Sequence, residues 1–426
     1  MFSQILSPLK TAFNILGNYW WIFTPVLLFF ASLESWLFYI RQKHLLSLKW
    51  TLLEIKPPPD VQKSPKIAEN IFAGIHSVYI KPLTWRDTFF KGKVQTWFSF
   101  EIIGTGGDIN FYVRTPEGLR NVVEAQIFAQ YPDAEIKPAD DYVDDMPKYL
   151  PNEEYNLFGT ELVFTKDDAY PIKTYPFFEE ESGKDEFKRT DPLSPLAEIM
   201  SALDPGERIW LQFLIRPTGG EWVKKAQAAV DKIIGKPEPK VDRGLLGAAV
   251  DVIDQAIGGN PIAAEEKKKE EFSLQKLTPG QKFVLDQVEN KIAKLGFKSS
   301  VRFVYLGRND NFRMSQISAV IGFFKQLYAN SLNSFKPNDT ITVAGGWFSW
   351  MFPSLEGFYA KEQTFKKKWQ LYQNYKKRVF PKNYIVLNTE ELATLWHLPG
   401  IGVKAPSFPR VEAKKGQPPV GLPTRN

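Results

Sequence analysis

The order of strand-like and helical patterns between residues 51 and 137 constrains the fold of this chain more than any other feature. Four short runs have the composition or alternation of strands: 51–55, 97–103, 108–114 and 134–137. Two stretches with apolar residues at helical spacing, 65–78 and 116–130, separate them. Strand, helix, strand, strand, helix, strand is the order of a split βαβ unit, in which two helices cover one face of an antiparallel sheet. The sequence therefore predicts an α+β protein with a ferredoxin-like domain over residues 50–140.

The glycine-rich stretch EIIGTGGDINFYVRTP, from Glu101 to Pro116, joins two of these strands. A phosphate-binding loop passes from a strand directly into a helix, so that the helix N-terminus faces the anion. Here the predicted helix begins only after the second strand, with Thr115 as the expected N-cap and Pro116 at the first position. Neither dinucleotide-binding nor Walker spacing is present. We expect a hairpin whose glycines adopt positive φ.

A second series of strands and helices follows an acidic linker. Strand-like runs occupy four positions: 159–166, 207–217, 297–308 and 384–388. Helical patterns lie between them at 194–203, 220–234, 281–296, 314–329 and 365–381. Residues 155–400 are therefore predicted to form a second α+β domain of the antiparallel sandwich type. Residues 236–279, which are rich in proline and charge, interrupt it as an insertion, and 401–426 form a proline-rich tail.

The N-terminal region is apolar and aromatic. Residues 19–40 read YWWIFTPVLLFFASLESWLFYI and carry one formal charge, Glu34. A helix of about 20 such residues crosses the hydrocarbon core, and aromatic residues at both ends suit its interfaces. The sequence predicts a transmembrane helix at 19–40, preceded by an interfacial amphipathic segment at 1–18.

Basic residues set the expected orientation of this helix. Arg41, Lys43 and Lys49 follow the span, whereas Lys10 precedes it. The positive-inside rule then places the large C-terminal part in the cytoplasm. The expected location is the inner (cytoplasmic) membrane, crossed once.

Motifs that carry chemistry are missing from the sequence. The chain has no cysteine and only three histidines, His44, His76 and His397, so thiolate sites are excluded and a histidine metal site is disfavoured. No nucleophile-elbow, zinc-protease or calcium-loop spacing occurs. We therefore expect no enzyme activity, no cofactor and no metal.

One basic helix is the candidate for a binding surface. Residues 361–382 interleave aromatic residues with six candidate contact residues: Lys366, Lys367, Lys368, Lys376, Lys377 and Arg378. Basic side chains contact phosphates and aromatic side chains stack on bases, which favours nucleic acid. The alternatives are an acidic lipid or protein surface, or a solvated face whose aromatics pack on the sheet. The net charge of +6 is too mild to decide between them.

Long segments of the chain resemble one family. The segments are QTWFSFEIIGTGGDINFYVRTPEGLRNVVEAQIFAQYPDAEI (95–136), DAYPIKTYPFFEE (168–180), ERIWLQFLIRPTGGEW (207–222) and NTEELATLWHLPG (388–400). They resemble the membrane-anchored N-terminal region of type IV secretion-like ATPases, of the conjugation coupling type, from candidate-phylum bacteria. In such proteins a P-loop ATPase domain follows a proline-rich segment like the one at 414–424.

The resemblance implies the membrane-anchoring part of a motor protein without its ATPase domain. This chain carries no Walker lysine, so no catalytic residue is carried over. The expected function is a non-enzymatic, membrane-anchored component of a secretion-like or DNA-translocating apparatus that docks a partner P-loop ATPase. The runner-up is a membrane-tethered nucleic-acid-binding protein that uses the helix at 361–382, and homo-oligomerisation stays open.

The same resemblance suggests where the partner would dock. The segment after Asn388, which is a predicted N-cap with Glu391 at the third helical position, leads into the motor in the resembling proteins. Its apolar residues are the candidate partner contacts: Leu392, Leu395, Trp396 and Leu398.

Overall fold

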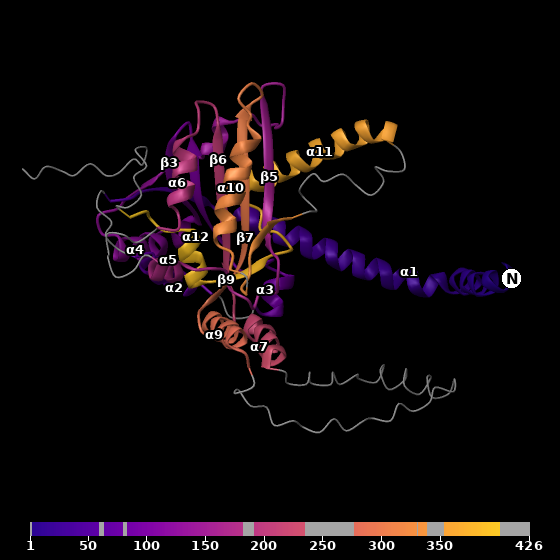
Figure 1. Ribbon diagram of the computed structural model, residues 1–426. Helices are drawn as coiled ribbons and strands as arrows, with labels where there is room; N and C mark the ends of the chain where they lie inside the picture. The colour runs from indigo at the N-terminus through magenta and orange to yellow at the C-terminus, as the bar shows by residue number, and fades with distance from the viewer. Residues whose placement is uncertain are drawn as a thin grey trace, which may run out of the picture.

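The computed structural model describes residues 2–58, 64–79, 83–181, 191–234, 277–329, 331–338 and 353–400. These residues form one antiparallel nine-stranded sheet with helices on both faces (Figure 1). The α+β class and the large antiparallel sheet are thereby confirmed. Most of the predicted insertion at 236–279 and the tail at 401–426 lie outside the described residues.

The first half of the sheet follows the predicted element order. It comprises β1 (Trp50–Lys56), α2 (Lys66–His76), β2 (Phe98–Thr105), β3 (Asp108–Pro116), α4 (Arg120–Gln130) and β4 (Glu135–Pro138), and its strands lie in the order β4-β1-β3-β2. A short helix, α3 (Trp85–Phe89), precedes β2.

The predicted hairpin at the glycine-rich turn is confirmed, whereas the predicted start of the following helix is wrong. Gly106 and Gly107 have φ of 54° and 100°, which confirms the hairpin between β2 and β3. The expected cap at Thr115 is wrong, because β3 continues to Pro116 and a 3-10 turn at Glu117–Leu119 precedes α4.

The second half of the sheet repeats this order with longer connections. Its elements are β5 (Tyr155–Phe164), α5 (Tyr175–Glu181), α6 (Ser194–Ser201), β6 (Arg208–Pro217), α7 (Glu221–Ile234), α9 (Pro279–Ile292), β7 (Gly296–Arg308), α10 (Met314–Gln326) and β8 (Phe335–Pro337). The strand order β6-β7-β5-β8 mirrors that of the first half. Strands β2 and β6 pair from Phe98↔Ile215 to Thr105↔Arg208, so both halves share one continuous sheet.

Helices from both halves cover one sheet face. Side chains of α2, α4, α6, α10 and α12 (Thr389–Leu395) join those of the strands in a single buried cluster. The opposite face is covered in part by α11 (Pro353–Lys376) and a 3-10 turn at Tyr142–Asp145, which bury Tyr142, Tyr372 and Tyr375 over Trp210. Strand β9 (Ile385–Asn388) pairs with the start of β7, from Gly296 to Ser299, beyond the end of β5.

The N-terminal region forms one helix, α1 (Phe2–Ser47), that projects away from the sheet (Figure 1). Among the helices that the structure describes, none combines the length and apolar content needed to cross a membrane. The prediction of a transmembrane helix at 19–40 is therefore not supported. Polar residues such as Thr24, Ser32 and Glu34 interrupt its aliphatic run.

Candidate functional site

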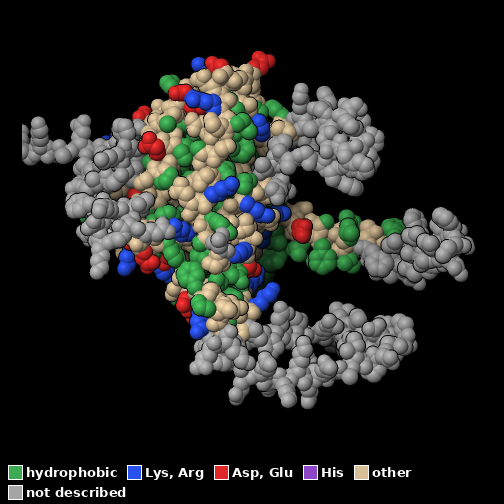
Figure 2. Space-filling model, in the orientation of Figure 1, with side chains coloured by type: hydrophobic (Ala, Val, Ile, Leu, Met, Phe, Trp, Pro, Cys, Tyr) green, Lys and Arg blue, Asp and Glu red, His purple; other side chains and the backbone are tan. Residues whose placement is uncertain are grey.

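Among the described residues, the largest run of exposed apolar side chains lies along α1. Five consecutive residues, Val26 to Phe30, are 53–68% exposed, so more than a full helical turn presents apolar side chains in every direction. The protruding segment is visible as hydrophobic side chains in Figure 2. Monomeric soluble proteins rarely leave a contiguous apolar patch uncovered, which marks α1 as a candidate attachment element.

The root of α1 is held by the segment around α3. The indole N–H of Trp36 donates to the carbonyl of Phe89 at 2.9 Å, and Ile40 is buried. Gly92 adopts φ 59°, and a Cβ there would lie 2.3 Å from the Ile40 carbonyl oxygen, so only glycine allows this close approach. The direction in which α1 leaves the body is therefore fixed by packing.

Two exposed aromatic residues, Trp85 and Phe90, flank this root, and we call them the aromatic collar. Their side chains are 65% and 66% exposed, and their rings are 5.7 Å apart. Thr84 caps α3 by accepting from the N–H of Asp87. The collar thus places a second apolar surface beside α1.

The basic helix predicted at 361–382 lies largely on α11, and two of its aromatic residues are buried, whereas Phe365 and Trp369 are exposed. Tyr372 and Tyr375 are fully buried against the sheet and cannot stack on bases. Among the six candidate contacts, Lys366 pairs with Glu362, Lys368 contacts Asn156, and Lys376 pairs with Asp144. Lys377 is exposed and Lys367 is half-buried. The helix is therefore anchored to the sheet by Tyr372 and Tyr375, with lysines along its outer side.

Arg378, the sixth candidate, is a correction to the sequence analysis. Its side chain has no exposed surface and its backbone adopts φ 49° just beyond the end of α11. The guanidinium donates to both carboxylate oxygens of Glu101, at 3.0 and 3.1 Å, and to Asp141 at 2.9 Å. It cannot contact nucleic acid or lipid, because it closes a buried ion cluster between α11 and the sheet.

Further polar groups complete this ion cluster. The Tyr142 hydroxyl and the Gln212 amide donate to Glu101 at 2.8 and 3.1 Å. Arg302 in turn donates to the Gln212 side-chain oxygen at 3.2 Å and to Glu161 at 2.7 Å. Burial alone would raise the pKa of Asp141, but the hydrogen bond and charge of Arg378 lower it below its usual value.

The residues proposed to contact a partner, which lie on and just after α12, are also placed differently from the expectation. Leu392, Leu395, Trp396 and Leu398 are at most 2% exposed. Trp396 packs against the ring of Phe100 at 4.8 Å in the main core. These side chains leave no surface for a partner, because α12 fills the sheet face rather than extending toward solvent.

The cap of α12 is as predicted. Asn388 accepts from the N–H of Glu391 at 2.8 Å, and the Glu391 carboxylate accepts from the N–H of Asn388 at 2.9 Å. Lys291 pairs with Glu391 at 3.0 Å, both side chains being fully buried. The capping box thus also fixes α12 to α9.

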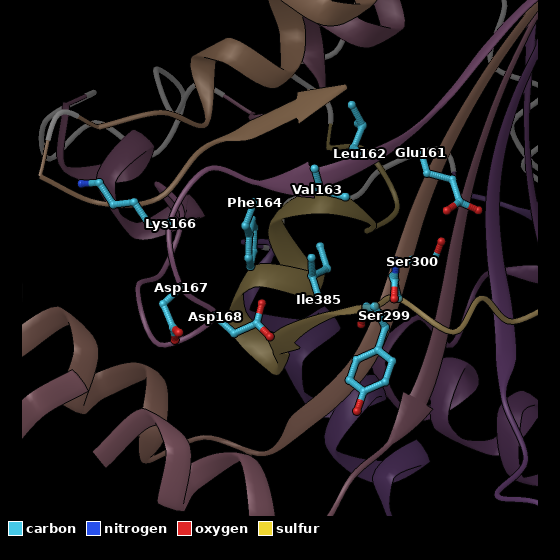
Figure 3. Close-up of a pocket in the computed structure, with 12 residues that line it drawn as sticks. Glu161, Leu162, Val163, Phe164, Lys166, Asp167, Asp168, Ser299, Ser300 and Ile385 are labelled. Carbon is cyan, nitrogen blue, oxygen red and sulfur yellow. The ribbon is translucent and has the colours of Figure 1, made fainter. Parts of the chain in front are cut away.

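A cavity of about 290 Å³ opens where the sheet divides. Strand β7 pairs with β5 over Val301–Arg308 and with β9 over Gly296–Ser299. Ser300 therefore lies between the two ladders. The Asp168 carboxylate points into this space, whereas Lys166 points away (Figure 3). Burial raises the pKa of Asp168, against the opposing charge of Lys291.

The described residues do not assemble a metal-binding group of three or more His, Asp or Glu side chains. His76 contacts the carbonyl of Thr218, and His397 lies between the Ala393 carbonyl and Asp191. Both imidazole rings therefore make hydrogen-bonding contacts that connect separate segments of the fold.

A family model matches the chain. The family model described as a domain of unknown function, DUF8128, matches residues 42–408. No curated protein matches the chain. Because the family model covers most of the sequence, the chain belongs to the DUF8128 family.

Proposed function

We propose that this protein is a non-enzymatic assembly component attached to a lipid bilayer through α1. The observation that carries the proposal is the exposed apolar turn from Val26 to Phe30, which has no covering element among the described residues. Burying each such side chain in an apolar environment contributes roughly 1.5–3 kcal/mol. A lipid surface takes up the apolar side chains of an exposed helix that lies in the interface, without the helix crossing the bilayer.

The surroundings of α1 support lipid as the apolar environment. Trp and Tyr favour the membrane–water interface, and Trp20, Trp21, Trp36 and Tyr39 flank the apolar turn at 49–61% exposure. Basic residues follow at Arg41 and Lys43. Anionic lipids of the cytoplasmic leaflet attract such residues, so we place the body on the cytoplasmic side of the inner membrane.

We infer that the body consists of two ferredoxin-like units joined through β2 and β6. The resemblance to the N-terminal region of type IV secretion-like ATPases suggests that this body docks a partner P-loop ATPase. The apolar residues of α12 are buried, so the proposed contact shifts to the proline-rich residues 401–426. Prolines lower the entropy lost when an extended segment is captured.

Removing the aromatic collar is expected to weaken lipid binding without unfolding the body. In the double variant Trp85→Ala and Phe90→Ala, we expect the affinity for vesicles containing anionic phospholipid to fall about tenfold or more, as two large apolar side chains leave the interface. Co-sedimentation with vesicles measures the affinity, and thermal unfolding checks the fold. Tyr149→Ala, at a similarly exposed ring on the body, is the matched control. Equal loss in control and double variant would show that the collar makes no specific contact.

Removal of residues 401–426 is expected to abolish capture of the ATPase while leaving vesicle binding unchanged. The measurement is enrichment of a P-loop ATPase on the detergent-solubilised full-length chain, identified by mass spectrometry. Neutralising three lysines on and just after α11, Lys366, Lys367 and Lys377, should have little effect on that enrichment. If these neutralisations instead remove a steeply salt-dependent DNA affinity and the tail deletion changes nothing, the nucleic-acid alternative is favoured.

A further inference from the structure

Two cations face each other at one end of the sheet. In the β6–β7 ladder Arg216 lies directly opposite Lys298, so their side chains share a sheet face. The Arg216 guanidinium stacks over the ring of Phe380 at 3.8 Å and lies 5.5 Å from that of Trp97. The Lys298 ammonium lies 4.9 Å from the ring of Tyr384. Like charges directly opposite each other destabilise a strand pair, so this arrangement calls for a compensating group.

Within the described part of the chain, neither Arg216 nor Lys298 forms an ion pair with a carboxylate. Arg216 makes no hydrogen bond or ion pair there, and its Nε is buried without an acceptor. Burial lowers the pKa of Arg216 to about 10. The group that raises this pKa in opposition is the Tyr384 side chain, not a carboxylate. Arg216 therefore differs from Arg302 and Arg378, which are buried cations of the same sheet face with carboxylate partners.

The neighbouring carboxylates do not pair with these two cations. Lys298 and Tyr384 also line a cavity of about 240 Å³, to which Asp167, Asp168 and Glu221 contribute carboxylates and Lys225 a further cation. Burial raises the pKa of Asp168, and the charges of Lys291 and Lys225 oppose that shift. Among the described residues none of these carboxylates forms an ion pair with Lys298 or Arg216, so both cations keep their capacity to bind an anion.

We propose that Arg216 and Lys298 form a binding site for a phosphate group. A guanidinium presents two parallel N–H groups to two phosphate oxygens, and a lysine ammonium adds a point charge on a third. The aromatic rings of Phe380 and Tyr384 hold the two cations at the surface of the sheet and restrict their motion. The phosphate group can come from free phosphate or from a lipid headgroup, since the site recognises the anion itself.

Thermal unfolding tests the proposal, because the Lys298→Glu variant should be more stable than the wild type without phosphate and should lose the stabilisation by added phosphate. In Lys298→Glu the cross-strand repulsion becomes an attraction, so this variant should unfold at a higher temperature than the wild type when phosphate is absent. Adding inorganic phosphate from about 0.1 to 10 mM should raise the melting temperature of the wild type and leave that of Lys298→Glu unchanged. Sodium chloride at equal ionic strength controls for screening.

A variant with the same change in net charge as Arg216→Gln distinguishes phosphate binding at the proposed site from a general effect of protein charge. Arg308→Gln removes one cation from the other end of β7, where Arg308 is exposed and pairs with Glu154 at 3.0 Å. This variant should retain the phosphate response of the wild type, whereas Arg216→Gln should lose about tenfold or more in phosphate affinity. Glycerol 3-phosphate, used as a soluble lipid headgroup, distinguishes the two sources. A stronger response to it indicates lipid, and a stronger response to inorganic phosphate indicates free phosphate.

Two results would overturn the proposal. In the first, neither phosphate compound shifts the melting temperature of the wild type beyond the chloride control. In the second, Lys298→Glu unfolds at a lower temperature than the wild type in phosphate-free buffer, which would mean that Lys298 has a stabilising partner. Because Lys298→Glu leaves the ring contacts of Arg216 in place, it remains informative even if Arg216→Gln fails to fold.

Discussion

Replacing Arg378 with methionine is expected to lower the free energy of unfolding by about 3–5 kcal/mol, the usual cost of leaving a buried charge without its partner. Glu101 has no exposed surface and receives two of its hydrogen bonds from Arg378. Methionine fills part of the volume but donates nothing, so Glu101 would remain buried with only its neutral donors. The same substitution frees the end of α11 from Asp141. Urea denaturation followed by far-UV circular dichroism measures the loss.

Lys377→Met is the matched control for this prediction. Lys377 precedes Arg378 in the chain, but its side chain is exposed. Surface substitutions of this kind usually change stability by no more than about 0.5 kcal/mol. If Arg378→Met were as stable as Lys377→Met, the ion cluster would not be what holds α11 to the sheet.

Local features of the fold could be read from the sequence because they depend on neighbouring residues. The hairpin glycines Gly106 and Gly107 adopt positive φ as expected, and Asn388 and Glu391 form the predicted capping box. A turn or a cap is decided within a few residues by backbone conformation and short-range hydrogen bonds. The strands of β6 and β7 were also predictable within a residue, since long β-branched and aromatic runs leave little alternative.

Long-range placement could not be read in the same way. An apolar face at helical spacing has the same pattern whether a partner or the sheet of its own chain covers it, so Trp396 was assigned to a surface although it lies in the core. The aromatic residues of α11 were ambiguous for the same reason. The joining of both halves through β2 and β6 depends on pairing between residues more than 100 positions apart, for which local pattern carries no signal.

Charged residues inside apolar strands are the sequence feature that indicates the buried ion cluster. Glu101 interrupts the run WFSFEII, and Arg302 interrupts VRFVYL. A charge in a strand buried on both faces requires a partner. Searching for opposite charges at such positions would have related Glu101 to a basic residue and withdrawn Arg378 from the set of surface contacts.

The attachment of α1 to lipid is the central claim, and it predicts a large effect of a local change. Replacing Leu27, Leu28, Phe29 and Phe30 with glutamine removes the exposed apolar turn but keeps good helix-forming residues. Each lost side chain is expected to cost roughly 1.5–3 kcal/mol of transfer free energy, which together exceeds a hundredfold in partitioning. The stability of the body should not change, because these side chains are exposed and project away from it.

Flotation of the full-length protein with phospholipid vesicles in high salt tests this claim most directly, since salt removes the electrostatic part of binding. The control is a variant with four exposed apolar residues of the body replaced by glutamine: Phe128, Tyr149, Leu295 and Met314. The account predicts that the wild type and this control float with the vesicles and that the α1 variant stays at the bottom of the gradient. Flotation of the α1 variant at the level of the wild type, or failure of the wild type to float, would contradict it.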